Sequence, residues 1–144
     1  MTHRQKFTQI ARYFETLTPD SVSQIKNLYA PSARFKDPFN DVKGISDIER
    51  IFKHMYVALE QPRFIVLEQI VDGDQAFLTW EFRFKFRRFD THTEQVVLGT
   101  THLVLDEQGQ ISLHRDYWDA AEELYEKLPV VGALMRWLKK RANS

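Results

Sequence analysis

The stretch AFLTWEFRFKFRRF, from Ala76 to Phe89, alternates large apolar residues with polar or charged ones. Side chains along a β-strand point to opposite faces in turn, so this pattern predicts a long strand. One face carries Trp80, Phe82, Phe84 and Phe86, and the other carries Glu81, Arg83, Lys85 and Arg87. We therefore expect an antiparallel sheet with one apolar face and one solvated face.

The neighbouring sequence predicts two hairpins. RFIVLEQIV precedes the alternating stretch, and Asp72 and Gly73 between them form a typical tight turn. The segments QVVLGTTHLVL and QISLHRDYW follow, joined by the turn sequence DEQG. A shorter strand, from Ala33 to Asp37, ends at Pro38, which cannot donate a ladder hydrogen bond.

Helical spacing of apolar residues appears on both sides of these strands. It predicts an amphipathic helix over residues 2–17, and a second short helix after TPD, where Thr18 can cap. Ser46 and Glu49 form a capping box that predicts a third helix, ending near Glu60. Residues 119–142 return to helical spacing, interrupted by Pro129. The order indicates a single α+β domain over residues 1–144, with 119–142 as a helical extension.

The composition excludes several classes of function. Twenty Lys and Arg balance twenty Asp and Glu, so net charge gives no argument for nucleic acid. FRFKFRRF alternates basic and aromatic residues, but nearby Glu68, Glu81 and Glu94 favour a solvated outer face. The chain has no Cys, and its His residues show no metal-ligand spacing, so we expect no metal site. No cofactor is implied.

No apolar run approaches the ~20 residues of a membrane span, so we expect a cytoplasmic protein. The tail from Pro129 is amphipathic and basic, with Arg136, Lys139, Lys140 and Arg141. It could lie on an anionic membrane surface, but we expect it to pack over the mouth of the fold or against a second subunit.

Three segments in this order, ARYFE, YAPSARFKDPF and LDEQGQISLHRDYW, resemble the superfamily named for nuclear transport factor 2. This group of cone-shaped α+β folds includes steroid delta-isomerases, SnoaL-like polyketide cyclases and scytalone dehydratase. The resemblance covers nearly the whole chain to Trp118. It implies a curved sheet wrapped around the N-terminal helices. A strongly twisted sheet on helices leaves a hollow, where we expect the functional site, and we expect a homodimer formed through the outer face of the sheet.

The isomerases of this superfamily suggest roles for particular residues. Their general base lies in an Asp-Pro pair at the end of the first strand, which Asp37 and Pro38 resemble. Their hydrogen-bond donor is a tyrosine on the first helix, where Tyr13 stands. Their third catalytic group, a protonated carboxylic acid, is replaced here by Thr101, whose hydroxyl is a weaker hydrogen-bond donor than a neutral carboxylic acid. Trp118 matches the aromatic wall of the last strand.

The same orientation places His114, Asp116 and Trp118 on the inner face of the last strand, and Ile111, Leu113, Arg115 and Tyr117 on the other. Phe35, Trp80 and Phe82 would then be apolar walls, which raise a carboxyl pKa by disfavouring the anion. Asp37 would remove a proton next to a carbonyl while Tyr13 stabilises the enolate oxygen. His114, oriented by Asp116, would relay the proton or act as a base.

Each of these residues also has a structural interpretation. Asp before Pro is common in turns, so Asp37 also fits a residue that organises its loop. Tyr13, at the edge of an apolar stripe, fits a core tyrosine with a solvated hydroxyl. His114 and Asp116 fit a polar pair on a sheet face.

Two functions remain open. The first is an isomerase, cyclase or lyase that acts on a small apolar or polycyclic carbonyl compound. The second is a non-catalytic domain that binds a ligand or a protein.

Overall fold

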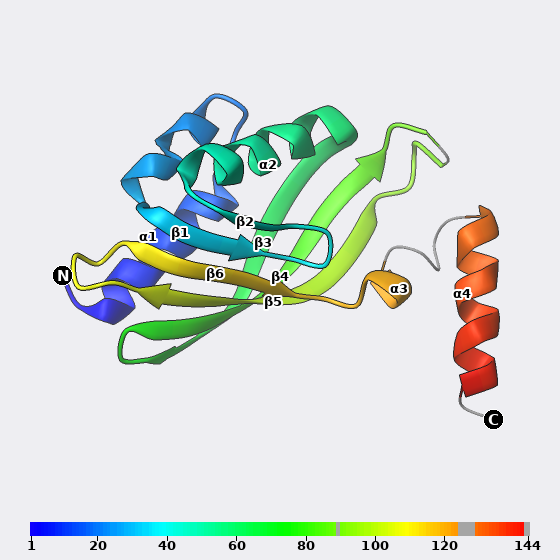
Figure 1. Cartoon of the computed structure of the whole chain (residues 1–144). Helices are drawn as coiled ribbons and strands as arrows, with labels where there is room; N and C mark the ends of the chain where they lie inside the picture. The colour runs from blue at the N-terminus through cyan, green and yellow to red at the C-terminus, as the bar shows by residue number, and fades with distance from the viewer. Residues whose placement is uncertain (89, 124–128, 143–144) are drawn as a thin grey trace.

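The computed structural model describes residues 1–88, 90–123 and 129–142. Within them, six strands form one curved, unclosed sheet in the order β2-β1-β6-β5-β4-β3 (Figure 1). The strands are β1 (Tyr29–Lys36), β2 (Asp41–Lys43), β3 (Leu59–Asp72), β4 (Gln75–Phe86), β5 (Gln95–Leu105) and β6 (Ile111–Tyr117). Both predicted hairpins are present, as β3–β4 and β5–β6. The α+β class and the curved sheet are thus confirmed.

The sheet departs from the sequence prediction at β1. This strand pairs in parallel with β6, whereas the other neighbouring strands are antiparallel. It is also longer than expected, and it pairs with β2, which the sequence did not predict. Pro38 lies in the connection between β1 and β2, after the last residue of β1.

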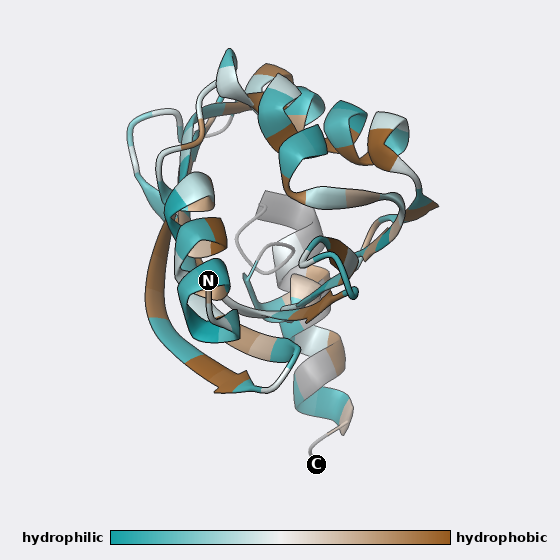
Figure 2. Ribbon diagram, turned by 90° about the vertical axis from the view of Figure 1, so that its left-hand side faces the viewer, coloured by the Kyte–Doolittle hydropathy of each residue, from teal (hydrophilic) through white to brown (hydrophobic). Residues whose placement is uncertain are grey.

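Two helices and a 3-10 turn lie on the concave side of the sheet (Figure 2). α1 (His3–Glu15) begins at a capping box, in which Thr2 and Gln5 each accept a hydrogen bond from the other's backbone N–H. The predicted second helix is the 3-10 turn η1 (Ser21–Asn27), and Tyr29 already belongs to β1. The N-cap of this turn is Asp20, which makes no side-chain capping bond, so the prediction that Thr18 is the cap is wrong. The Thr18 hydroxyl accepts from the Ser21 N–H in the preceding turn instead.

The capping box predicted at Ser46 and Glu49 is wrong. The N-cap of α2 (Ile45–Ala58) is Gly44, two residues before Ser46, and it makes no side-chain hydrogen bond. Gly44 has a φ of 102°, a conformation that side chains with a Cβ rarely adopt. Glu49 forms an ion pair with Lys53 one turn later instead.

A bulge in β6 changes which of its residues face inward. Leu105 pairs with Ile111, but Val104 pairs with Leu113, so Ser112 is an extra residue in the ladder. The bulge lets Ile111 and His114 both point to the concave side, and both are buried. The prediction that Ile111 faces outward with Arg115 and Tyr117 is therefore wrong.

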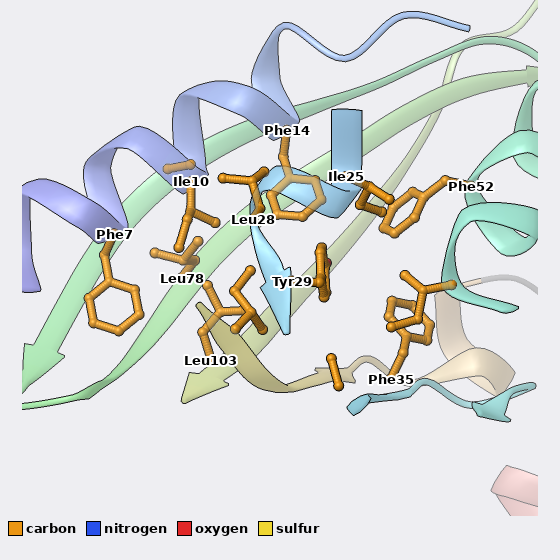
Figure 3. Packing of buried hydrophobic residues seen from close by; sticks show 14 of the residues in the cluster. Phe7, Ile10, Phe14, Ile25, Leu28, Tyr29, Phe35, Phe52, Leu78 and Leu103 are labelled. Atoms are coloured by element: carbon orange, nitrogen blue, oxygen red, sulfur yellow. The ribbon is translucent and has the colours of Figure 1, made fainter. Parts of the chain in front are cut away.

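The core fills one end of the fold. α1 contributes Phe7, Ile10 and Phe14, which contact inward side chains such as Leu78 and Leu103 (Figure 3). These side chains occupy the end of the sheet nearest α1. Toward the C-terminal half of α2, helix and sheet diverge.

The C-terminal extension forms α3 (Ala120–Glu123) and α4 (Pro129–Ala142). Proline suits the first position of α4, because the N–H it lacks has no partner in a first helical turn. Leu124 and Leu128, part of the predicted helical pattern, lie outside the described residues. Leu134, Trp137 and Leu138 are exposed on α4. In the described part of the chain, no helix combines the length and apolarity needed to span a membrane.

Candidate functional site

A cavity of about 550 Å³ opens between the C-terminal half of α2 and strands β1, β3, β4, β5 and β6. Most of its walls are aromatic or aliphatic. The aromatic side chains come mainly from the inward faces of the strands and include Phe35, Phe64, Trp80, Phe82 and Phe84. Phe39 and Trp118, with ring centroids 5.6 Å apart, also line it. Such a cavity suits a flat, mostly apolar ligand.

The alternating pattern of β4 accounts for most of this wall. Trp80, Phe82 and Phe84 face the cavity, while the intervening Glu81 and Arg83 form an ion pair with each other. Phe82 is the cross-strand partner of Phe64, and their rings stack with centroids 4.7 Å apart. The face that the sequence assigned to the apolar side of this strand is therefore the cavity wall.

Asp116 brings a carboxylate to this apolar cavity. Its Oδ1 accepts a hydrogen bond from the Thr101 hydroxyl at 2.6 Å and contacts His114 Nε2 at 2.8 Å. The opposite ring nitrogen of His114, Nδ1, lies 2.6 Å from the Tyr29 hydroxyl. Trp80 Nε1–H donates to Thr101 Oγ1 at 2.8 Å. Five side chains from four strands thus form one chain of hydrogen bonds.

The positions of the protons in this chain of hydrogen bonds follow from the Tyr29 hydroxyl, which stays protonated. Burial, with the nearby Asp116 and Tyr13, raises the pKa of Tyr29 well above its ordinary value of 10.0, so the hydroxyl keeps its proton. Tyr29 then donates to His114 Nδ1, and the remaining ring proton lies on Nε2 and points at Asp116. We assign His114 as this neutral tautomer on that basis. Every donor in the chain then points toward the Asp116 carboxylate.

The two oxygens of Asp116 therefore differ. Oδ1 receives both donors, whereas Oδ2 has no hydrogen-bond partner among the described residues. Asp116 lines the main cavity and also a small cavity of about 30 Å³ next to Thr101 and His114. That small cavity is large enough to hold one water molecule.

Asp37 lies at the mouth of the main cavity, in the connection between β1 and β2. Its Oδ1 accepts hydrogen bonds from the backbone N–H groups of Phe39, at 2.8 Å, and Asn40, at 2.7 Å. The Asn40 side-chain amide also donates to it, at 3.1 Å. These bonds form an Asx turn that shapes the loop after β1. Asp37 thus both organises a turn and lines the cavity.

Tyr13 does not line the cavity. Its hydroxyl donates to the Ser21 carbonyl at 2.8 Å, which ties α1 to η1. Burial, with Tyr56 and Glu49 nearby, raises the pKa of Tyr13 to about 12. Of the predicted site residues, the structure thus brings Asp37, Asp116, Phe35, Trp80, Phe82 and Trp118 to the main cavity. His114 and Thr101 lie behind Asp116, and Tyr13 stands apart.

The sequence did not indicate Tyr29 as part of the site. Its contact with His114 depends on the parallel pairing of β1 and β6, which sequence patterns did not predict. Arg50 and His54, on α2, line the cavity and were also missed. Their spacing of four residues places them on one side of the helix, a signal that could have suggested them. Within the described residues, no group of His, Asp or Glu is arranged to hold a metal ion.

The fold and this cavity define a cone-shaped α+β protein with a deep apolar site. The family model described as a SnoaL-like domain matches residues 10–114, and the chain belongs to this family, within the nuclear transport factor 2-like superfamily. No curated protein matches the chain.

Solved structures with the same fold share little sequence with this chain. A hypothetical protein from Catenulispora acidiphila, with a ketosteroid isomerase-like fold and bound trimethylamine, has a TM-score of 0.70 and 16% identity, covering 86% of this chain and 92% of that one. A putative SnoaL-like polyketide cyclase from Jannaschia has a TM-score of 0.69 and 16% identity, covering 83% of this chain and 88% of that one. TerC, co-crystallised with polyporic acid, has a TM-score of 0.68 and 14% identity, covering 83% of this chain and 93% of that one. At such identities the likeness supports the fold alone.

Proposed function

We propose that the cavity binds a small, mainly apolar carbonyl compound and that Asp116 acts as the general base on it. The observation that carries this proposal is the unpartnered Oδ2 of Asp116 at the wall of an aromatic cavity. Apolar walls exclude water from the carboxylate, which strengthens its interaction with a bound ligand.

In the proposed reaction, Oδ2 removes a proton from the carbon next to the carbonyl. The C–H electron pair moves into the new C=C bond, the carbonyl oxygen becomes an enolate, and Asp116 becomes a carboxylic acid. Returning the proton to another carbon gives an isomer. Attack of the enolate on a second carbonyl closes a ring, and the new alkoxide takes the proton back from Asp116. Loss of a β-leaving group, which takes that proton as it departs, gives an alkene. On the α2 side of the cavity, the exposed His54 ring offers an N–H donor for the enolate oxygen, and the Arg50 guanidinium, which also pairs with Asp47, offers further N–H groups.

His114 and Tyr29 support Asp116 in this proposal. The imidazole N–H holds Oδ1, and the buried Tyr29 hydroxyl fixes the tautomer of the ring. This arrangement leaves Oδ2 without a protein donor and available to a ligand. His114 therefore acts as a positioning residue.

The sequence prediction gave the base to Asp37 and the oxyanion donor to Tyr13. Asp37 remains a candidate, because it lines the same cavity. We favour Asp116, because Asp37 Oδ1 is already occupied by three donors from its own loop. The Tyr13 hydroxyl is likewise committed to the Ser21 carbonyl.

The proposal can be tested without knowing the natural substrate. β-Tetralone is an apolar bicyclic ketone whose α-protons exchange with deuterated water, and NMR follows that exchange. We expect the native protein to accelerate exchange, and Asp116→Asn to reduce the acceleration by about 10²–10⁴-fold. Quenching of tryptophan fluorescence by β-tetralone reports binding by both proteins.

Binding without any acceleration by the native protein would support the second function, a non-catalytic ligand-binding domain. Equal acceleration by the native protein and Asp116→Asn would exclude Asp116 as the base.

We also propose that a second copy of the chain covers the outer face of the sheet. Ile70, Phe77, Leu98 and Tyr117 are exposed large side chains on β3, β4, β5 and β6. Exposed apolar groups on one sheet face are typical of a subunit interface. Light scattering should give the mass of a dimer for the native chain and a smaller mass for Phe77→Glu. A native monomer would contradict this proposal.

A further inference from the structure

Besides lining the cavity, Trp80 packs closely against the backbone of β5. The cross-strand partner of Trp80 on β5 is Gly99. A Cβ added at Gly99 would lie 2.3 Å from Cη2 and 2.6 Å from Cζ2 of the Trp80 indole. Atoms of this kind do not approach so closely, so the six-membered ring occupies space that only glycine leaves open. Gly99 therefore fixes where the indole lies.

This position aims the indole N–H at Thr101, two residues further along β5. Trp80 Nε1 lies 2.8 Å from Thr101 Oγ1, and both side chains are buried. An indole nitrogen can donate but cannot accept. It therefore takes an acceptor position on Thr101, and the single hydroxyl proton remains available for Asp116 Oδ1, 2.6 Å away. The direction of the Thr101 hydrogen bond thus follows from Trp80.

We infer that Trp80, held in place by Gly99, is a positioning residue that acts through Thr101 to keep Asp116 ionised and oriented. The inference rests on the proposed function, since it concerns the same carboxylate. A hydroxyl that accepts one bond becomes a stronger donor in the next, so the indole N–H strengthens the bond to Asp116. Donors to a carboxylate stabilise its ionised form, the form that acts as a base.

Two arms of hydrogen bonds, each made of two side chains, reach Asp116. Tyr29 and His114 form one arm, and Trp80 and Thr101 form the other; both end on Oδ1. Because the arms approach the same oxygen, they hold the carboxylate plane and leave Oδ2 toward the cavity. The wall residue Trp80 therefore serves two purposes, packing against a ligand and tuning the base.

The direct test is the titration of the Asp116 carboxyl carbon by NMR in the full chain, with Asp116→Asn used to assign its resonance. Thr101→Val removes the donor with little change in shape, and we expect the titration midpoint to rise by about one pH unit. Thr101→Ser retains the hydroxyl and should restore the native midpoint. Trp80→Phe keeps a ring but loses the N–H, and the midpoint should rise by about half a unit.

Gly99→Ala should displace the indole and raise the midpoint as Trp80→Phe does. Combining the two changes should add nothing further, because both break the same contact. Trp118→Phe, which removes an indole from the same cavity, should alter β-tetralone binding and leave the midpoint unchanged. Circular dichroism verifies that each variant is folded, and the Thr101 pair provides the test if Trp80→Phe is not.

Unchanged midpoints in Trp80→Phe and Gly99→Ala would overturn the inference and leave Trp80 as a wall residue alone. This result is separate from the fate of the proposed function, since the titration requires no activity. If β-tetralone exchange is measurable, the acid limb of its pH profile should move upward with the same variants. A uniform fall in rate at every pH would mean a purely structural role for Trp80.

Discussion

Two carboxylates face the same cavity from different surroundings. Asp37 lies in the loop after β1, and its hydrogen bonds come from residues two and three positions away. Asp116 lies on β6, and the chain of bonds behind it reaches β1, β4 and β5. The loop around Asp37 can form from local sequence alone. The environment of Asp116 exists only when the whole sheet is assembled.

The two surroundings suit different roles: that of Asp37 suits a residue that stabilises a turn, and that of Asp116 suits a general base. A carboxylate whose oxygen is occupied by backbone N–H groups stabilises a turn, and it has little freedom to take a proton from a ligand. A carboxylate whose hydrogen bonds all go to one oxygen, at the wall of an apolar cavity, has its second oxygen available to take a proton from a ligand. The predictions below test whether the two carboxylates differ in this way.

The largest effect on stability should come from His114→Ala. This change removes a buried ring, leaves the Tyr29 hydroxyl without its partner, and withdraws a donor from Asp116. We expect the free energy of unfolding in urea to fall by about 3 kcal/mol. A loss below about 1 kcal/mol, the range of an ordinary surface change, would mean that the chain of hydrogen bonds contributes little to the fold.

Titration of Tyr29 should make the stability of the protein depend on pH in the alkaline range. Its pKa is raised in the folded state, so the folded protein holds this proton more tightly than the unfolded chain does. The stability this provides is complete below the unfolded pKa of about 10 and is lost as pH rises above it. We expect the free energy of unfolding to fall as the pH rises above about 10, by up to ~1.4 kcal/mol per pH unit for this group.

Tyr29→Phe should flatten that slope and lower stability at neutral pH by about 1–2 kcal/mol, since His114 Nδ1 loses its donor. Tyr13 and Tyr56, whose pKa values are also raised, retain part of the slope. An unchanged slope in Tyr29→Phe would contradict the assigned role of this hydroxyl.

Asp37→Ala should cost less. It leaves the N–H groups of Phe39 and Asn40 without their acceptor, but both lie near solvent, so we expect a loss of about 1 kcal/mol. Asp37→Asn keeps an acceptor oxygen and should recover part of it. Urea unfolding of the two variants measures the difference, and equal losses would mean that the turn depends on the charge.

Tyr13→Phe should have the smallest effect. It removes one hydrogen bond to the Ser21 carbonyl and should lower stability by about 0.5–1 kcal/mol. β-Tetralone exchange should stay within about threefold of the native rate, because Tyr13 does not line the cavity. A hundredfold loss of exchange with normal binding would instead support Tyr13 as the donor to the enolate oxygen.

Local and periodic features of this fold were predictable from sequence. The alternation in β4 predicted a strand with an aromatic inner face, and the two hairpins and α1 were in their predicted places. The tight turn at Gly73, which has a positive φ, was predictable from the conformational freedom of glycine. The Thr18 hydroxyl accepts a backbone hydrogen bond before η1, although it is not the N-cap. The capping box at Ser46 failed because Gly44 and the preceding strand pair determine where α2 starts.

The site was only partly predictable, because its contacts join distant segments. The family resemblance and the two-residue spacing together predicted that His114 and Asp116 share the inner face of β6, but their partners depend on the pairing of β6 with β1 and β5. The bulge at Ser112, which turns Ile111 inward, has no signal in the residue pattern. Tyr29 and Tyr13 have the same chemistry, and only the assembled sheet determines which of them reaches the buried network.

The most direct test of the central claim compares Asp116→Asn with Asp37→Asn in β-tetralone exchange, at ligand concentrations that saturate both variants. The account predicts that Asp116→Asn loses exchange by at least about 10²-fold, while Asp37→Asn stays within about threefold of the native rate. Loss of exchange in Asp37→Asn with native rates in Asp116→Asn would contradict it and make Asp37 the base.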